Sequence, residues 1–497
     1  MTNRLGTVME EGCRESDTLI VSKKPSNNAP SAECAAEGVE RRGVAKGNPA
    51  GEARVRTQSR TALPASLDRI RQATARPEVG RLTALFHHIY SPEMLSAAFY
   101  ALNRHSAAGI DKQTWDEYAA DLDVRLPDLS RRLRRDSYRP PPVRRVYIPK
   151  GDGRQRPIGI PTLEDKIVQR ATALVLECIY EGDFKGFSYG FRPNRSPLKA
   201  ADAVLVALDT QRINWLLDAD LKGFFDHLDH EWMTRFLHHR IGDRRVIALI
   251  RRWLKAGVME EGVLHAITEG TPQGGSISPL LANIYLHYVL DTWIAKWRKI
   301  ADGNVFIVRY ADDFVIGCQY YRDLIRLEPQ LRRRMARFGL SLNEEKTRTI
   351  RFGRFAAQSR AERGEGRPET FEFLGFTYIC GKDAKGRFRI LRHTSAKRLR
   401  AKLKEIKAGL RSRINWKIWD VGKWLRRVVQ GHINYYGVKY NYCNLRRFRY
   451  RVILMWFKTL NRRSQRRGVN WELMKRIATH WIPAHYPLRP YPRLETL

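Results

Sequence analysis

The chain of 497 residues is long enough for about two or three packed domains, and its 43% hydrophobic residues supply their cores. Its 90 Lys and Arg against 52 Asp and Glu leave a formal charge of +38, which favours a polyanionic partner, nucleic acid ahead of a membrane surface. No apolar run reaches the roughly 20 residues that span a bilayer, and six scattered cysteines without a CxxC pair indicate neither a disulfide framework nor a zinc site.

The first 66 residues differ in composition from the rest. They are rich in Ser, Ala, Gly and Asn with mixed charge, which predicts a disordered tail. Helical patterning begins near Leu67, and hydrophobic segments then alternate with turns, which predicts a domain of mixed helices and strands. Within it, IPKGDGRQRPIGIP predicts a hairpin whose Lys150, Arg154 and Arg156 could grip triphosphate oxygens or a template backbone.

Pairs of acids interrupt two apolar stretches. In NWLLDADLKGFFDHLDH, Asp218 and Asp220 are two positions apart and therefore lie on one face of a predicted strand. In FIVRYADDFVIGC, two short strands would form a hairpin with Asp312 and Asp313 at its turn. Taken alone, this second pair could equally be an ordinary acidic turn, because four residues make a weak motif.

If the two strands meet, their carboxylates come together and repel one another. The usual resolution is a pair of hard divalent cations bridged by carboxylate oxygens, and two Mg²⁺ ions are the expected counter-charge. Such a pair activates an attacking hydroxyl and stabilises the leaving oxygen of an in-line phosphoryl transfer.

Two further stretches suit nucleotide addition. GTPQGGSISPLLANIY is a Gly-rich loop that enters a helix, where small residues let the backbone approach a substrate and Gln273 can hydrogen-bond. Lys346, in GLSLNEEKT, could protonate a departing pyrophosphate; the alternative is a solvated surface lysine.

Residues 397–467 are strongly basic. They carry 22 Lys or Arg against two acids, Glu405 and Asp420, so more than half of the net charge lies there. Apolar stripes at helical spacing predict three amphipathic helices with basic outer faces. The stripes are Leu399, Leu403, Ile406 and Leu410; Val421, Leu425 and Val428; and Leu445, Phe448, Val452, Trp456 and Leu460. Trp and Tyr residues interleave with the charges, which suits stacking on unpaired bases, although such aromatics more often pack in a core.

Several stretches follow one another in a specific order: GIDKQTW, IPKGDGRQRPIGIPTLEDK, FSYGFRPNRS, DLKGFFD, GTPQGGSISPLLANIY, RYADD, GLSLNEEKT and FEFLGF. Over about residues 67–380 this series resembles the reverse transcriptase blocks of bacterial group II intron-encoded proteins. The basic region that follows, with WLRRVVQGHINYYG and RRSQRRGVNW, resembles their thumb and maturase region. The resemblance implies an α+β right-hand polymerase with fingers and an antiparallel palm sheet, then an α-helical thumb/maturase bundle over residues 381–475 and a Pro- and aromatic-rich tail over 476–497.

The resemblance also assigns roles to single residues. It implies that the catalytic metal ligands are Asp220, Asp312 and Asp313. Lys346 matches the general acid, and Asp218 and Asp226 are then structural. Phe225 stands where these enzymes carry an aromatic steric gate that would clash with a ribose 2′-hydroxyl. The expected nucleotide-binding residues are Lys150, Arg156, Leu221, Phe225, Gln273 and Gly274. The expected RNA-binding residues are Arg426, Arg427, Tyr435, Tyr436, Arg446 and Arg447.

These features predict an RNA-directed DNA polymerase that copies intron RNA into DNA and binds that RNA to promote splicing and mobility. Its expected partners are group II intron RNA, an RNA template with a DNA primer, deoxynucleotides and target DNA, in the bacterial cytoplasm and in association with the nucleoid. Because the last hundred residues contain only Cys443, we expect no endonuclease domain. Two alternatives stay open: an RNA-binding splicing cofactor with an idle polymerase site, and a domesticated reverse transcriptase without an intron partner.

Overall fold

The computed structural model describes residues 65–75, 80–149, 155–260, 263–265, 270, 274–463, 468–484, 486 and 488–492. Residues 1–64 of the expected amino-terminal tail, 1–66, lie outside the described residues, so disorder there stays a prediction. In the described part of the chain, no helix combines the length and the apolar character needed to cross a membrane.

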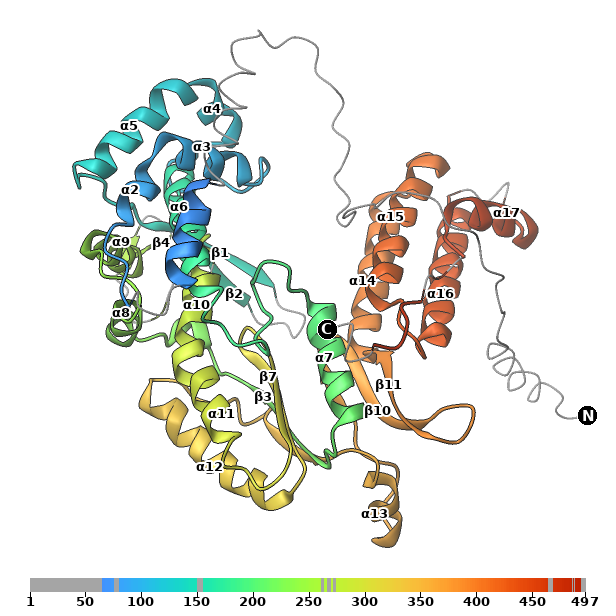
Figure 1. Ribbon diagram of the computed structural model, residues 1–497. Helices are drawn as coiled ribbons and strands as arrows, with labels where there is room; N and C mark the ends of the chain where they lie inside the picture. Colours follow the sequence, from blue (N-terminus) through green and yellow to red (C-terminus); the bar gives the residue numbers. More distant parts are fainter. Residues whose placement is uncertain are drawn as a thin grey trace, which may run out of the picture.

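Helices gather at the amino-terminal end of the described chain and form what we call the amino-terminal lobe (Figure 1). They are residues 65–75, α2 (Phe86–Tyr90), α3 (Pro92–Ala101), α4 (Trp115–Ala120), α5 (Leu122–Arg134) and α6 (Leu163–Tyr180). Side-chain caps satisfy free amides of the first helical turns: the Ser91 hydroxyl accepts from Met94, and Thr114 and Glu117 form a capping box.

The central helix of this lobe, α6, is buried along most of its length. Its Asp165 is buried and accepts hydrogen bonds from the Tyr138 hydroxyl at 2.8 Å, the Trp253 indole at 2.6 Å and the Gln169 amide at 2.9 Å. Burial raises the pKa of Asp165 to about 6, although these three bonds favour the ionised form. The lobe therefore contains a carboxyl group that titrates near neutral pH.

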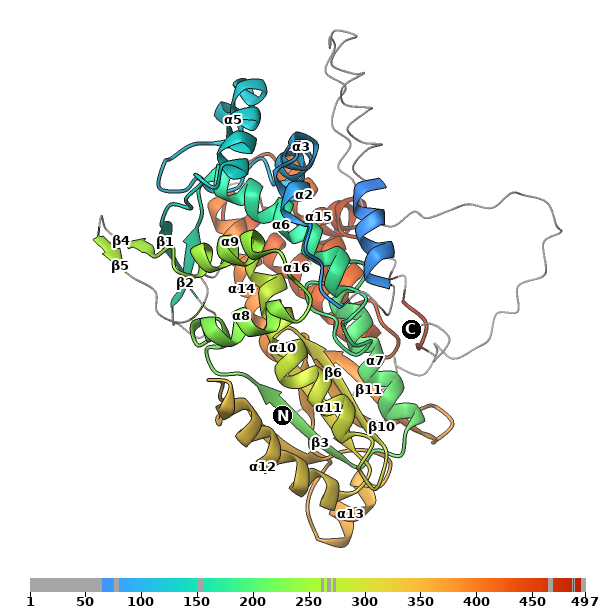
Figure 2. The same cartoon turned by 60° about the vertical axis from the view of Figure 1, so that its left-hand side comes forward.

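A small sheet extends from the lobe and confirms the predicted hairpin around Arg156. Its strands, in the order β2-β1-β4-β5, are β2 (Gln155–Ile160), β1 (Val143–Pro149), β4 (Val258–Glu260) and β5 (Val263–His265). β1 and β2 pair antiparallel, and Figure 2 shows β4 and β5 projecting from the body. The turn with Lys150 and Arg154 lies outside the described residues.

The central sheet divides the middle of the molecule into two cores. Among the described residues its strands are, in order, β6 (Val305–Tyr310), β7 (Asp313–Cys318), β3 (Trp215–Asp220) and β8 (Arg348–Arg351), and each neighbouring pair is antiparallel. Side chains alternate between the faces, as strand geometry requires. One face, with Leu217 and Ile316, packs against α10, α11 and α12; the other, with Leu216 and Val315, packs against α7.

The helices around this sheet follow one another closely in the chain. They are α7 (Pro197–Thr210), the 3₁₀ turn η2 (Phe224–Asp226), α8 (His230–His238), α9 (Arg244–Leu254), α10 (Ser278–Leu286), the π-helical turn η3 (His287–Asp291), α11 (Thr292–Trp297), α12 (Tyr321–Arg337) and α13 (Ala356–Glu362). α10, η3 and α11 are contiguous, so the π turn lies inside one long helical segment beside the sheet.

The basic region forms a helical bundle, as predicted, and includes a helix that was not predicted. Its members are α14 (Ala396–Ser412), α15 (Ile418–Tyr436), α16 (Tyr442–Asn461) and α17 (Trp471–Trp481). The first three contain the predicted apolar stripes, of which Leu399, Leu403 and Val428 are only partly buried. α17 was not predicted; it packs Met474 and Ala478 against the same core. In Figure 1 the bundle stands apart from the amino-terminal lobe, beside α7.

The domain boundaries expected at residues 380 and 475 do not coincide with the structural divisions. Residue 380 lies within the middle strand of a three-stranded sheet, and residue 475 lies within α17. The strands are β9 (Phe371–Phe373), β10 (Phe376–Lys382) and β11 (Phe388–Thr394). Because Phe371 and Phe376 pack in the α7 core, this sheet belongs to the body, and the bundle begins after it.

The segment after α17, for which the sequence suggested only RNA contact, returns to the body. The Arg489 amide donates to the Gly437 carbonyl at 2.8 Å. Tyr491 packs beside the α7 core. This part of the expected tail therefore ties the end of α15 to the three-stranded sheet.

Candidate active site

The register of the central sheet brings the predicted acids together. β3 and β7 pair so that Asp220 lies directly opposite Asp313, and Asp312 stands at the turn of the β6–β7 hairpin. Ala311 adopts a left-handed conformation with φ of 58°, which makes that turn tight. The predicted convergence of the two strands is thus confirmed, while metal binding by these side chains stays a prediction.

Burial and mutual repulsion raise the pKa values of these acids. Desolvation, and then the charges of the neighbouring acids, raise the pKa of Asp313 well above its ordinary value. Burial and the charge of Asp220 also raise the pKa of Asp312, against the opposing charges of Arg156 and Lys346. Neighbouring carboxylates repel one another when they are all ionised, and a bound cation would stabilise the ionised forms.

Asp218, which the resemblance left as a structural acid, belongs to the same cluster. Its carboxylate lies 3.6 Å from the Arg348 side chain on β8. Burial raises the pKa of Asp218 to about 6, although Arg348 opposes the shift. Its charge in turn contributes to the raised pKa of Asp313. Asp218 thus pairs with the edge strand and adds negative potential beneath the turn.

Lys346 reaches the cluster from the loop before β8. Its Nζ lies 2.5 Å from Asp220 Oδ2, and 60% of its side chain is exposed. The loop is tied to β3 because the Asn343 amide donates to the Asp220 carbonyl at 2.8 Å. The lysine is therefore paired with a predicted catalytic acid although most of its side chain is exposed, and its role as a general acid stays a prediction.

The chemistry of the donors fits a hard divalent cation, because every side-chain donor of the cluster is a carboxylate oxygen. Within the described residues, however, no group of three or more His, Cys, Asp or Glu side chains is arranged to hold a metal ion. The Lys346 ammonium provides the cationic partner of Asp220 in this arrangement. A metal ion bound at Asp220 would therefore compete with a long, largely exposed lysine side chain.

A buried arginine holds the acidic turn in place. The Arg309 guanidinium donates to Asp291 Oδ1 at 2.8 Å and Oδ2 at 2.5 Å, to Ser188 Oγ at 2.7 Å, to Asn283 Oδ1 at 3.1 Å and to the Ala311 carbonyl at 3.0 Å. These bonds use all five N–H donors of the side chain. This role was not predicted from the sequence, although an arginine in an apolar strand is itself a signal, since a buried charge needs a partner.

Two of the sequence motifs supply residues that pack behind the acidic turn. FSYGFRPNRS contributes Ser188 and also Gly190, where a Cβ would lie 2.4 Å from the Ala311 amide nitrogen. GTPQGGSISPLLANIY contributes Asn283, whose amide donates to the Gly190 carbonyl at 2.5 Å. Segments far apart in the sequence therefore meet behind the acidic turn, and only glycine fits at the point of closest approach.

The Gly-rich loop passes close to two other parts of the site. Gly274 has φ of 120°, and a Cβ there would lie 2.6 Å from the Gly159 carbonyl oxygen of β2. At Gly270, with φ of 84°, a Cβ would lie 2.8 Å from the carbonyl oxygens of Phe225 and Asp226. Gly270 thus lies against η2, and Gly274 lies against the β1–β2 hairpin.

The other predicted nucleotide-binding residues have different surroundings. Arg156 is exposed on β2, and its charge acts on the acidic turn. Leu221 is 3% exposed and packs in the core, so its side chain is not available for a direct contact. Phe225 is half-buried at the edge of that core. Lys150 and Gln273 lie outside the described residues.

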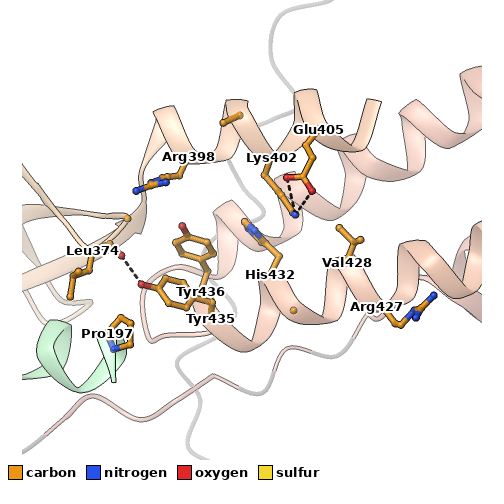
Figure 3. Close-up of a pocket in the computed structure, with 13 residues that line it drawn as sticks. Pro197, Leu374, Arg398, Lys402, Glu405, Arg427, Val428, His432, Tyr435 and Tyr436 are labelled. Carbon is orange, nitrogen blue, oxygen red and sulfur yellow. Dashed lines mark hydrogen bonds and ion pairs between the residues drawn. The ribbon is translucent and has the colours of Figure 1, made fainter. Parts of the chain in front are cut away.

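The residues predicted to bind RNA divide into two groups. Exposed arginines form one group: Arg426, Arg427, Arg446 and Arg447. The two tyrosines form the second group. The Tyr435 hydroxyl donates to the Leu374 carbonyl at 2.8 Å and its ring stacks on Phe376, so both the hydroxyl and the ring are used in contacts within the protein. Tyr436 is half-buried and lines a pocket between α14 and α15 (Figure 3).

One known protein family matches the part of the chain that contains the acidic cluster. Residues 148–378 match the family described as "Reverse transcriptase (RNA-dependent DNA polymerase)". This range contains the end of β1, all of β2, the Gly-rich loop and the acidic cluster.

Individual proteins are also similar to this chain in sequence. The chain is 39% identical over 268 residues to Protein YkfC of Escherichia coli (strain K12), which covers 48% of this chain and 70% of that protein. It is 37% identical over 224 residues to the Group II intron-encoded protein LtrA of Lactococcus lactis subsp. cremoris, which covers 44% of this chain but only 36% of that protein. A shorter match, 30% identical over 100 residues, is to Nuclear intron maturase 1, mitochondrial, of Arabidopsis thaliana, covering 19% of this chain and 13% of that protein.

Proposed function

The chain belongs to the reverse transcriptase family, among the group II intron-encoded reverse transcriptases and maturases, and on this basis we propose that it copies intron RNA into DNA and binds that RNA to promote splicing and mobility. The observation that carries the proposal is the register that sets Asp220 opposite Asp313, with Asp312 at the adjoining turn. This is the arrangement that the in-line transfer of a nucleotide to a primer hydroxyl needs.

In this proposal the amino-terminal lobe and its hairpin act as fingers, the central sheet as palm and the helical bundle as thumb. The substrates are an RNA template with a DNA primer and deoxynucleotides, and the further partners are the intron RNA and its target DNA. A location in the bacterial cytoplasm, in association with the nucleoid, stays a prediction.

Each part of the site has a task in the proposed reaction. Asp220, Asp312 and Asp313 would hold two Mg²⁺ ions, which supply activation of the primer hydroxyl and neutralisation of phosphate charge. Arg309 keeps the turn in position by binding the Ala311 carbonyl. Lys346 holds a proton beside the acidic cluster, where it can pass to a departing pyrophosphate.

The sugar of the incoming nucleotide would be selected at η2. Phe225 packs at the edge of the core, and its backbone carbonyl lies so close to Gly270 that a Cβ there would be 2.8 Å away. A ring held in this way excludes a ribose 2′-hydroxyl, so deoxynucleotides are the expected substrates.

Primer extension tests the proposal. The purified chain should extend a DNA primer on an RNA template with Mg²⁺, and Asp312→Ala should abolish extension while RNA binding persists. Asp123→Ala is the control, because Asp123 is an exposed acid on α5. Loss of binding and extension together would mean that Asp312 supports the fold, and binding without extension in the unaltered chain would favour a splicing cofactor with an idle site.

A further inference from the structure

A pocket of about 680 Å³ lies between the bundle and the body. α14 and α15 form one side, and Leu374 and Gly375 of the β9–β10 turn, with Pro197 of α7, form the other (Figure 3). None of the predicted catalytic acids lines it. Its size lies in the range of about 300–1,000 Å³ that is typical of sites for small organic ligands.

A buried histidine faces this pocket. The His432 residue is 7% exposed and lines the pocket, and its Nε2 has no hydrogen-bond partner in the described part of the chain. The ring is fixed because it stacks on Phe448, with 3.8 Å between centroids. A buried polar nitrogen without a partner is costly, and Nε2 is itself closed to solvent, so a ligand that reached it after a shift of the pocket wall would lower that cost.

His432 is suited to hydrogen-bond a neutral group. Burial, and then the charge of Lys402, lowers the pKa of the imidazole to about 4, so the ring is neutral near pH 7. A neutral imidazole donates at one nitrogen and accepts at the other. The edges of nucleobases carry both donors and acceptors, and they match such a partner.

Cations stand at both ends of the pocket. Arg398 lies at the end near Tyr436, and Arg427 lies at the opposite end (Figure 3). Neither forms an ion pair with an acid among the described residues, whereas Lys402 is paired with Glu405 at 2.9 Å. Unpaired guanidinium groups bind phosphate oxygens well, so the two ends suit the phosphates on either side of one nucleotide.

The walls between these cations are aromatic and apolar. Tyr436 closes one end, where its hydroxyl comes so near to Gly375 that a Cβ there would lie 2.8 Å away. Val428 and Ala401 add apolar surface. An unpaired base could pack against these groups, whereas a base inside a duplex already has its faces and its pairing edge occupied.

We propose that this pocket takes one unpaired nucleotide of the bound RNA. The base would pack on Tyr436 and hydrogen-bond His432, and the flanking phosphates would bind Arg398 and Arg427. RNA is favoured over DNA because the Glu405 carboxylate, which accepts from Lys402 within the pocket, keeps a lone pair for a ribose 2′-hydroxyl. The inference rests on the proposed function, because it takes RNA as the partner of the chain.

A substitution at Gly431 can fill the pocket without disturbing the fold. A Cβ added there meets nothing within 4 Å, and the residue lines the pocket. Gly431→Leu therefore places a side chain in the cavity and also replaces a helical glycine by a better helix former. Ala408→Leu is the matched control, because Ala408 is exposed on α14 and does not line the pocket.

The probe is a short single-stranded oligouridylate with one 4-thiouridine, crosslinked to the full chain by light and mapped by mass spectrometry. We expect crosslinks in residues 427–436. Gly431→Leu should reduce their yield about fivefold or more, which is the effect of losing one stacked base. Ala408→Leu should leave the yield unchanged. His432→Phe, which keeps an aromatic ring against Phe448, should reduce them similarly. A blunt RNA duplex should compete poorly.

The outcomes separate this inference from the proposed function. A chain that binds RNA and extends primers but gives no crosslink in residues 427–436, or gives one that Gly431→Leu leaves unchanged, overturns the inference alone. An equal yield with the matching thio-substituted DNA strand overturns the assignment to RNA. A chain that neither binds RNA nor extends primers overturns both.

Discussion

Replacing Arg309 with methionine should separate the stability of the central sheet from the geometry of its acidic turn. The Arg309 and Asp291 side chains are both 0% exposed. Removing one member of such a pair leaves an uncompensated buried charge, which costs about 3–5 kcal/mol. Because a domain is stable by only about 5–15 kcal/mol, we expect a large fall in the free energy of unfolding.

The double variant Arg309→Met with Asp291→Leu tests the positioning role. It removes both charges and leaves apolar side chains of similar size, so the part of the lost stability that comes from the lone buried charge should return. The Ala311 carbonyl still loses its guanidinium donor, and Ser188 and Asn283 lose theirs. A misplaced turn should therefore lower the rate of nucleotide addition about tenfold to a hundredfold.

Urea unfolding and single-turnover primer extension measure the two effects separately. Arg309→Lys is a useful comparison, because a lysine keeps the charge but has only three donors and no planar fork. A double variant with recovered stability and an unchanged rate would refute the positioning role. A single methionine variant as stable as the unaltered chain would refute the cost assigned to the buried charge.

Phe225→Val should raise ribonucleotide incorporation relative to deoxynucleotide incorporation by on the order of tenfold, and an unchanged ratio would contradict the steric gate. Replacing the exposed bundle arginines by alanine should weaken RNA binding and flatten its salt dependence, by about 0.7–0.9 in logarithmic slope for each lost phosphate contact. The arginines are Arg426, Arg427, Arg446 and Arg447. Asp165, with a folded pKa of about 6, binds its proton more tightly in the folded than in the unfolded state. Stability should therefore fall by about 2–3 kcal/mol as pH rises from about 4 to 7, and Asp165→Asn should remove that slope in urea titrations.

The acidic cluster was predictable because local patterns define it. The alternation around Asp220 marks a strand, and two apolar stretches joined by two acids mark a hairpin, so convergence needed only that the two meet in one sheet. The basic bundle was predictable for the same reason, since apolar residues recur there at helical spacing.

The remaining features depend on contacts between distant parts of the chain, which local patterns do not specify. Arg309 acts through Ser188, 121 positions away in the chain. Tyr435 has the same local pattern as a stacking residue, yet its hydroxyl and ring are used inside the protein. α17 was missed because its apolar residues lie beyond the recurring stripes that defined the bundle.

The chain order of the arginine network has a consequence for synthesis on the ribosome. Ser188, Asn283 and Asp291 all precede Arg309, and Asp291 precedes it by 18 positions. At roughly 5–20 residues per second, the carboxylate waits about one to four seconds for its counter-charge. During that interval, docking of the helical segment through η3 would bury a lone anion, which favours completion of this core only after the β6 strand and its acidic turn have emerged.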